Sequence, residues 1–207
     1  MTKKFAITIG RQLGSGGREI GREIAVRLKI SYYDKELLQI ASRESGLGKE
    51  FFEEMDEKKS HSLFGGIFDL RNILAEGYYS NAFLTNETLF KIQSDVIRSL
   101  AEKQSCLFLG RCADYVLKDL PECLNIYISA NLSDRIKRIS GLQQVTEGKA
   151  REIIEKCDKK RAAYYRFFSN KTWGAASSYH LSINSSVLGI RETTEFILDF
   201  AEKRFGL

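Results

Sequence analysis

The chain has 207 residues, of which 43% are apolar and 29% charged, a composition that is typical of a globular domain and excludes a disordered chain. The net charge of +5 fits a solubilising surface with a basic cleft better than a nucleic-acid partner. Nucleic-acid-binding domains more often concentrate positive charge in a patch or a long run, whereas the densest cluster here is the short segment of residues 156–166. No stretch approaches the roughly 18 apolar residues of a membrane span, and the apolar run near the N-terminus is too short for a signal peptide.

Short apolar runs and helical periodicity alternate along the chain. Most of the runs are continuous rather than alternating, which is typical of parallel strands covered on both faces. The predicted strands are residues 5–9, 30–33, 106–109, 124–129 and 180–183, and the predicted helices are one opening near residue 17 and residues 34–40, 86–104, 112–118, 132–139, 146–168 and 191–205. This alternation predicts a three-layer α/β fold with a five-stranded parallel sheet.

Residues 45–84 depart from this alternation, because they contain no strand. Helical patterns cover residues 49–59 and 68–79, around a polar stretch that contains glycine. We therefore predict a helical insertion within a single domain of residues 1–207. It is either a surface excursion or a mobile flap that binds an acceptor substrate.

The first predicted strand ends in a glycine-rich loop, and a helix follows at once (FAITIGRQLGSGGREIG, residues 5–21). Glycines allow backbone amides to approach an anion beside a helix N-terminus, so Gly14, Ser15, Gly16 and Gly17 are candidate phosphate ligands. The Walker A pattern places a lysine and then a hydroxyl after its last glycine, and this loop has neither.

Three arginines near this loop, Arg11, Arg18 and Arg22, are candidates to supply the missing positive charge, because guanidinium groups suit phosphate oxygens. Arg22 fits a solvated helix face equally well. A dinucleotide-binding G-x-G-x-x-G pattern is the alternative, with Asp34 as its acidic residue. It fits less well, since a glutamate stands where the last glycine belongs. Asp34 is retained as a candidate substrate-binding residue.

Two further groups of residues are candidates for chemistry. Arg111 and Asp114 follow the third predicted strand, where parallel sheets bind ligands, although Asp114 also fits an ordinary helix N-terminus. Asp158, Arg161 and Arg166 lie on the long helix after residue 146. They are either surface charges or part of a lid over residues 141–175 that closes on transferring phosphates, with Gly141 and Gly148 as hinges.

Four cysteines without a C-x-x-C pair predict a reduced, cytoplasmic protein with no metal site. The two histidines, His61 and His180, lack the spacing of metal ligands. His180 falls in a predicted strand, which favours a structural role.

The segments GSGGREIG, GRCADY and DKKRAAYY together resemble the cytidylate kinase-like family of nucleoside monophosphate kinases, in order along nearly the whole chain. The resemblance implies a P-loop kinase fold with a helical insertion and a helical lid. It also implies Mg²⁺-dependent transfer of a phosphoryl group from ATP to a nucleoside monophosphate.

By position, residues 14–17 would hold the β-phosphate of ATP, Arg111 would bind the acceptor's phosphate, and Asp158 and Arg161 would be the lid's aspartate and arginine. Cytidylate kinases have aspartate where Cys112 stands and lysine where Gly17 stands, so cytidine specificity does not follow. Two alternatives stay open: a nucleotide sensor without transfer activity, and a basic protein associated with nucleic acid.

Overall fold

The computed structural model describes residues 4–34, 40, 43, 46 and 81–207 of the chain, with side chains from residue 87 onward in the last range. The chain forms two compact units: residues 1–35 with 98–207, and residues 36–97. The helices predicted at residues 49–59 and 68–79, and most of the one at 34–40, lie outside the described residues.

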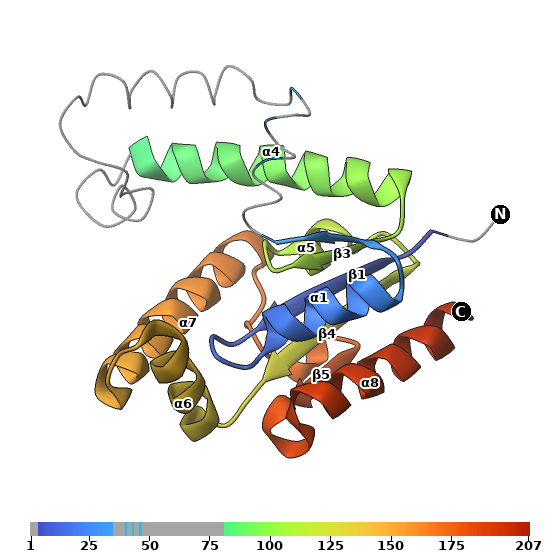
Figure 1. Cartoon of the computed structure of the whole chain (residues 1–207). Coiled ribbons are helices and arrows are strands. Elements are labelled where there is room, and N and C mark those ends of the chain that lie inside the picture. The colour runs from blue at the N-terminus through green and yellow to red at the C-terminus, as the bar shows by residue number, and fades with distance from the viewer. Residues whose placement is uncertain (1–3, 35–39, 41–42, 44–45, 47–80) are drawn as a thin grey trace. The chain divides into compact units, whose positions relative to one another are not determined.

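The first unit is built on five parallel strands, as predicted from the apolar runs (Figure 1). The strands are β1 (Ala6–Arg11), β2 (Ser31–Tyr33), β3 (Cys106–Leu109), β4 (Cys123–Ser129) and β5 (Leu181–Asn184). Their order is β2-β3-β1-β4-β5, so β1 lies at the centre and pairs with both β3 and β4. The carboxyl end of β1 is therefore flanked by the loops that follow its two neighbours.

Helices α1 (Gly17–Arg27) and α8 (Ser185–Phe205) lie side by side against one face of this sheet (Figure 1). Alternate residues of β1, including Ile7 and Ile9, form a buried core with Ile24 of α1 and Ile197 of α8. The burial of these apolar side chains is the main free-energy contribution that holds α1 against the sheet, and so fixes the position of the N-terminus of α1 after the loop.

Helix α8 begins earlier than the predicted residue 191 and is interrupted at Gly189, whose φ of +77° is not helical. The Asn184 side chain accepts a hydrogen bond from the Ser186 amide and caps the first segment. Apolar periodicity resumes only after the interruption, which explains why the sequence pattern missed the first turn.

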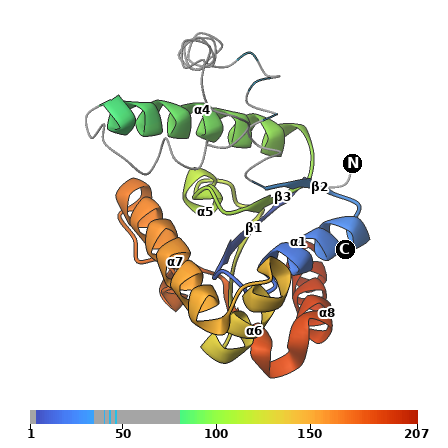
Figure 2. The ribbon, with the colours of Figure 1, turned by 60° about the vertical axis from the view of Figure 1, so that its left-hand side comes forward.

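Helices α6 (Leu132–Gln143) and α7 (Glu147–Ser169) lie side by side (Figure 2) and share a small core around Ile139 and Ile154. The α7 boundaries agree with the prediction, and the Thr146 hydroxyl caps the helix by accepting from the Lys149 amide. Gly141 and Gly148, which were predicted as hinges, lie inside α6 and α7 respectively. The chain turns from α6 into α7 at Gln144, whose φ is +52°.

Two short helices complete the first unit: α5 (Ala113–Val116), which follows β3, and the 3₁₀ helix η1 (Ala176–Ser178) before β5. Helix α4 (Asn81–Lys103) confirms the predicted helix at 86–104, and its residues up to 97 belong to the second unit. Within that unit the Ser94 hydroxyl donates to the Phe90 carbonyl. Among the described helices, none is long and apolar enough to cross a bilayer.

Candidate active site

The loop between β1 and α1, residues 10–17, is called the glycine loop below. Gly14 and Gly16 adopt φ values of +81° and +76°, in the left-handed region that glycine tolerates best. The backbone amides of Gly14, Gly16 and Gly17 make no hydrogen bond to any residue that the structure describes. They precede the first hydrogen-bonded turn of α1, so they can bind an oxyanion at the positive end of the helix.

The glycine loop is held from outside by α6 and α8. The Arg138 guanidinium of α6 donates to the Gly14 carbonyl, and the Ser185 hydroxyl of α8 donates to the Ser15 carbonyl at 2.7 Å. The Ser15 side chain turns inward and donates to the Gln12 carbonyl at 2.9 Å. The loop therefore keeps its shape without a ligand, and the Ser15 hydroxyl serves that shape.

Asp158 of α7 is a second anchor of the glycine loop. One of its carboxylate oxygens accepts from the Leu13 amide at 2.9 Å, and the other accepts from the Arg135 guanidinium of α6. Arg135, which is almost fully buried, also donates to the Leu13 carbonyl at 2.8 Å. The carboxylate that was predicted to be catalytic thus lies at the glycine loop. One of its oxygens binds the loop and the other binds Arg135.

Three arginines from different elements approach each other at this edge of the sheet. Arg161 of α7 donates to the Arg11 carbonyl at 3.0 Å and lies 3.8 Å from the Asp158 carboxylate. Arg111, after β3, lies over the ring of Tyr164 at 4.8 Å. Burial and the charges of Arg161 and Arg111 lower the pKa of Arg11 to about 9. A bound anion would relieve this repulsion.

Arg18 and Asp34, both predicted from the sequence, form an ion pair of 2.7 Å, although they were assigned different roles. The Asp34 side chain is buried at the end of β2, whereas that of Arg18 is 57% exposed. Arg22, the third candidate cation, lies over the Tyr32 ring at 5.7 Å. Because Asp34 partly neutralises the Arg18 guanidinium, Arg18 attracts a phosphate less strongly.

Arg166, a predicted catalytic residue of α7, makes no hydrogen bond or ion pair with the glycine loop in the part of the chain that the structure describes. It lies on an exposed part of α7, where its carbonyl accepts from the Asn170 amide that ends the helix. The neighbouring Tyr165 is buried instead. The rings of Tyr164 and Phe167 contact that of Phe168 on the same helix.

Asp114 of α5 is buried and accepts a hydrogen bond from the Tyr165 hydroxyl at 2.7 Å. Burial raises the pKa of Asp114 above its usual range, although the Tyr165 hydrogen bond opposes the rise. Burial also raises the pKa of the adjacent Cys112 thiol to about 12, so this thiol is protonated and unreactive at neutral pH. The Asp114–Tyr165 bond joins α5 to α7.

Replacing Asp114 with asparagine should stabilise the protein at pH 7. The folded state raises the pKa of Asp114, so it binds more protons than the unfolded state between the two pKa values, and stability falls as pH rises through that interval. Asparagine keeps an oxygen for Tyr165 without the buried charge. The Tm advantage of Asp114→Asn should shrink as pH falls toward about 4. Thermal melts at several pH values test this, and an advantage independent of pH would contradict it.

Two arginines that the sequence analysis missed, Arg135 and Arg138, make some of the closest contacts to the glycine loop. They lie three residues apart on one face of α6, in a helix that also carries Asp134 and Lys137. Such a pattern is typical of a solvated helix face. Nothing in the local sequence distinguishes these guanidinium groups from surface charges.

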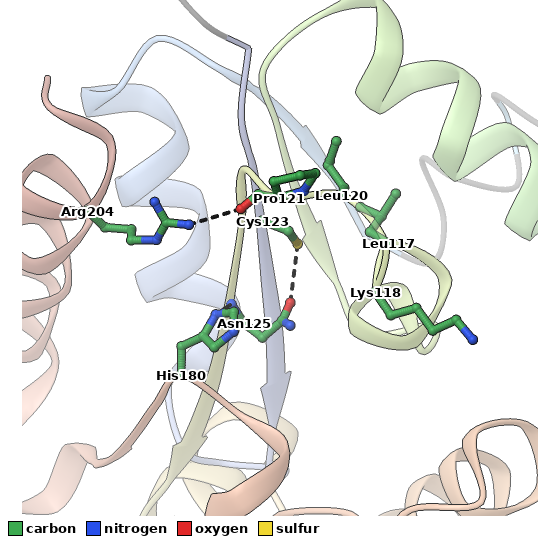
Figure 3. A pocket seen from close by; sticks show the side chains of 8 residues that line it. All are labelled: Leu117, Lys118, Leu120, Pro121, Cys123, Asn125, His180 and Arg204. Carbon is green, nitrogen blue, oxygen red and sulfur yellow. Dashed lines mark hydrogen bonds between the residues drawn. The ribbon is translucent and has the colours of Figure 1, made fainter.

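A cavity of about 250 Å³ lies near the amino end of β4, away from the glycine loop (Figure 3). Its lining includes Cys123, Asn125, His180 and Arg204. The His180 Nδ1 accepts from the Asn125 amide, and burial raises the pKa of the Cys123 thiol to about 12. His180 thus makes a backbone contact of the kind that a structural histidine makes, just before β5.

Residues 6–187 match the model of the cytidylate kinase-like family. No curated protein gives a significant match. An uncharacterized protein from Eubacterium ventriosum ATCC 27560 has a TM-score of 0.72 at 24% identity, with 97% of this chain and 99% of that chain covered. Shikimate kinase from Bacteroides thetaiotaomicron has a TM-score of 0.52 at 13% identity, with 98% of this chain and 99% of that chain covered. Dephospho-CoA kinase from Campylobacter jejuni has a TM-score of 0.51 at 14% identity, with 97% of each chain covered. The fold is that of P-loop kinases.

Proposed function

Since this chain belongs to the cytidylate kinase-like family, we propose that it transfers the γ-phosphoryl group of ATP to a nucleoside monophosphate. The observation that carries the proposal is the glycine loop, whose amides are available beside three converging arginines. Phosphoryl transfer needs positioning and charge neutralisation more than a covalent nucleophile, and this arrangement offers both. The four cysteines are free thiols, which supports a reducing, cytoplasmic setting for the reaction.

In the proposed reaction, the glycine loop at residues 14–17 binds the β-phosphate of ATP through the amides of Gly14, Gly16 and Gly17, since the Ser15 amide donates to the Gln12 carbonyl. A phosphate oxygen of the acceptor, oriented by Arg111, attacks the γ-phosphorus. The bond from the γ-phosphorus to the β–γ bridging oxygen breaks, and ADP leaves. Arg161 neutralises charge on the equatorial oxygens, and Asp158 acts as a positioning residue because it fixes the Leu13 amide.

The described residues suit magnesium only as an ion held mainly by the nucleotide. No three His, Cys, Asp or Glu side chains gather among them as a metal cluster. The Ser15 hydroxyl and both Asp158 oxygens already have protein partners. Since magnesium often binds through substrate phosphates and few protein ligands, we expect ATP to bring it into the site. It would then neutralise charge on the phosphates.

The direct test is a coupled assay of ADP release with ATP and each common nucleoside monophosphate, with and without magnesium. ADP formed with a monophosphate, above the rate with ATP alone, supports the proposed transfer. A protein that ATP stabilises in thermal-shift measurements, but that gives no product with any acceptor, would instead be a nucleotide sensor. The absence of a lysine at Gly17 favours that second candidate. Retention on DNA or RNA that depends on salt would favour the nucleic-acid alternative.

Replacing Arg161 with alanine should lower kcat by about 100-fold or more, with a smaller change in KM. An arginine that neutralises charge in the transition state of phosphoryl transfer is commonly worth at least this much. Arg151→Ala is the matched control, because Arg151 lies on the same helix and, among the residues that the structure describes, forms its ion pair with Glu155 at the surface. Equal rates for the two variants would remove Arg161 from the mechanism.

A further inference from the structure

The structure offers an explanation for the missing lysine of the glycine loop. A Cβ atom built on Gly17 would lie 2.7 Å from the Cβ of Arg11 and 3.0 Å from its Cγ. Real Cβ atoms do not approach other carbons this closely, so the Arg11 stem already fills the space that a side chain at position 17 would enter. A lysine there and an arginine at position 11 exclude each other.

The head of the Arg11 side chain is accommodated by a second glycine. A Cβ on Gly110, at the end of β3, would lie 2.3 Å from the Arg11 Nη1, and Gly110 itself has a φ of +80°. Gly17 and Gly110 are 93 residues apart in the sequence (110 − 17), yet each lacks a side chain where the same arginine passes. The Arg11 side chain therefore runs from the base of α1 across the carboxyl end of β3.

The Arg11 guanidinium makes no hydrogen bond or ion pair with any described residue; the hydrogen bond from Arg161 goes to its backbone carbonyl. Its charged neighbours include Arg161 and Arg111, which repel it. Other arginines near the loop are committed: Arg18 to Asp34, and Arg138 to the Gly14 carbonyl. A largely buried cation without a counter-ion, beside amides without acceptors, is arranged for an anionic ligand.

We propose that Arg11 is the phosphate-binding cation of this loop, replacing a lysine at position 17 from the opposite side of the same space. The positive charge has moved from the first residue of α1 to the last residue of β1. The inference rests on the proposed function for the identity of the ligand, a nucleoside triphosphate. It selects Arg11 over Arg18 among the cations that the sequence offered.

The test compares four proteins by calorimetric titration with ATP and with inorganic triphosphate: wild type, Arg11→Met, Gly17→Lys, and Arg11→Gly/Gly17→Lys, in which glycine at position 11 also removes the colliding Cβ. Arg11→Met should weaken triphosphate binding by about 10- to 100-fold, because charge-assisted hydrogen bonds are lost. Gly17→Lys alone should bind no better than wild type and melt at a lower temperature, since the lysine collides with Arg11. The double variant should bind at least about tenfold more tightly than Arg11→Met, because the lysine then has room.

Arg27→Met is the matched control, since Arg27 lies at the far end of α1 and pairs with Glu195 at the surface. Arg11→Met should keep or raise the Tm, because a buried charge without a partner is removed; a purely structural arginine would lower it. Unchanged triphosphate affinity in Arg11→Met would overturn the inference, and so would a double variant no better than Arg11→Met. If wild type binds triphosphate through Arg11 yet forms no ADP with any acceptor, only the proposed transfer fails.

Discussion

Replacing Asp158 with alanine should lower the free energy of unfolding by about 3–5 kcal/mol and abolish detectable triphosphate binding. Arg135 would remain almost fully buried without its carboxylate, and removal of one partner of a buried ion pair is costly for that reason. The Leu13 amide would also lose its acceptor. For a chain of this size, the loss corresponds to a fall in Tm of roughly 6–20 °C.

Thermal and urea unfolding measure this effect, with Glu152→Ala as the control on the same helix. Glu152 pairs with Lys149 at the surface, where an ion pair contributes at most about 1 kcal/mol. A second variant, Asp158→Ala/Arg135→Met, removes both charges and should recover much of the lost stability. If Asp158→Ala melts like the control, the carboxylate does not anchor the glycine loop.

Replacing Gly14 with alanine should cost about 2–5 kcal/mol of stability and at least about tenfold in triphosphate affinity. A left-handed backbone costs a residue with a side chain about 1–2 kcal/mol, and overpacking adds about 1–3 kcal/mol. The new Cβ would lie 2.9 Å from the backbone carbonyl oxygen of Arg135, which cannot move aside as a side chain can. The loop would have to shift, and its amides with it.

Gly141→Ala is the contrasting variant. Gly141 lies inside α6, and apart from the backbone of this helix no atom of the described residues lies within 4 Å of where its Cβ would be. Alanine there should stabilise the protein by about 0.5–1 kcal/mol, because it restricts the unfolded chain and favours the helix. Chemical unfolding of both variants, with calorimetric titration of triphosphate, gives the comparison. Loss of stability at both positions would mean that local strain at Gly14 is not the cause.

Two side chains of α7, Asp158 and Arg161, contact the glycine loop. The sequence assigned Asp158 and Arg161 to a lid, and in the structure both side chains hold the backbone of the glycine loop. Their catalytic role stays a prediction, but the contacts show that α7 can deliver arginine charge to the end of β1. Arg166, five residues later, has no such contact among the described residues, so its proposed part in the reaction rests on the charge pattern of the sequence alone.

The sequence by itself determined the parallel sheet, the glycine loop at the end of β1 and the family, because apolar runs, helical periodicity and glycine spacing are local signals. Only the tertiary structure decided which charges serve the loop. The sequence pattern places Arg135 and Arg138 on a surface face of α6, but folding buries Arg135 and brings Arg138 to the Gly14 carbonyl. Gly17 is a missing lysine in the sequence, and only the structure places Arg11 and Gly110 beside each other and beside Gly17. These outcomes depend on contacts between residues far apart in the chain, whose energies no local pattern records.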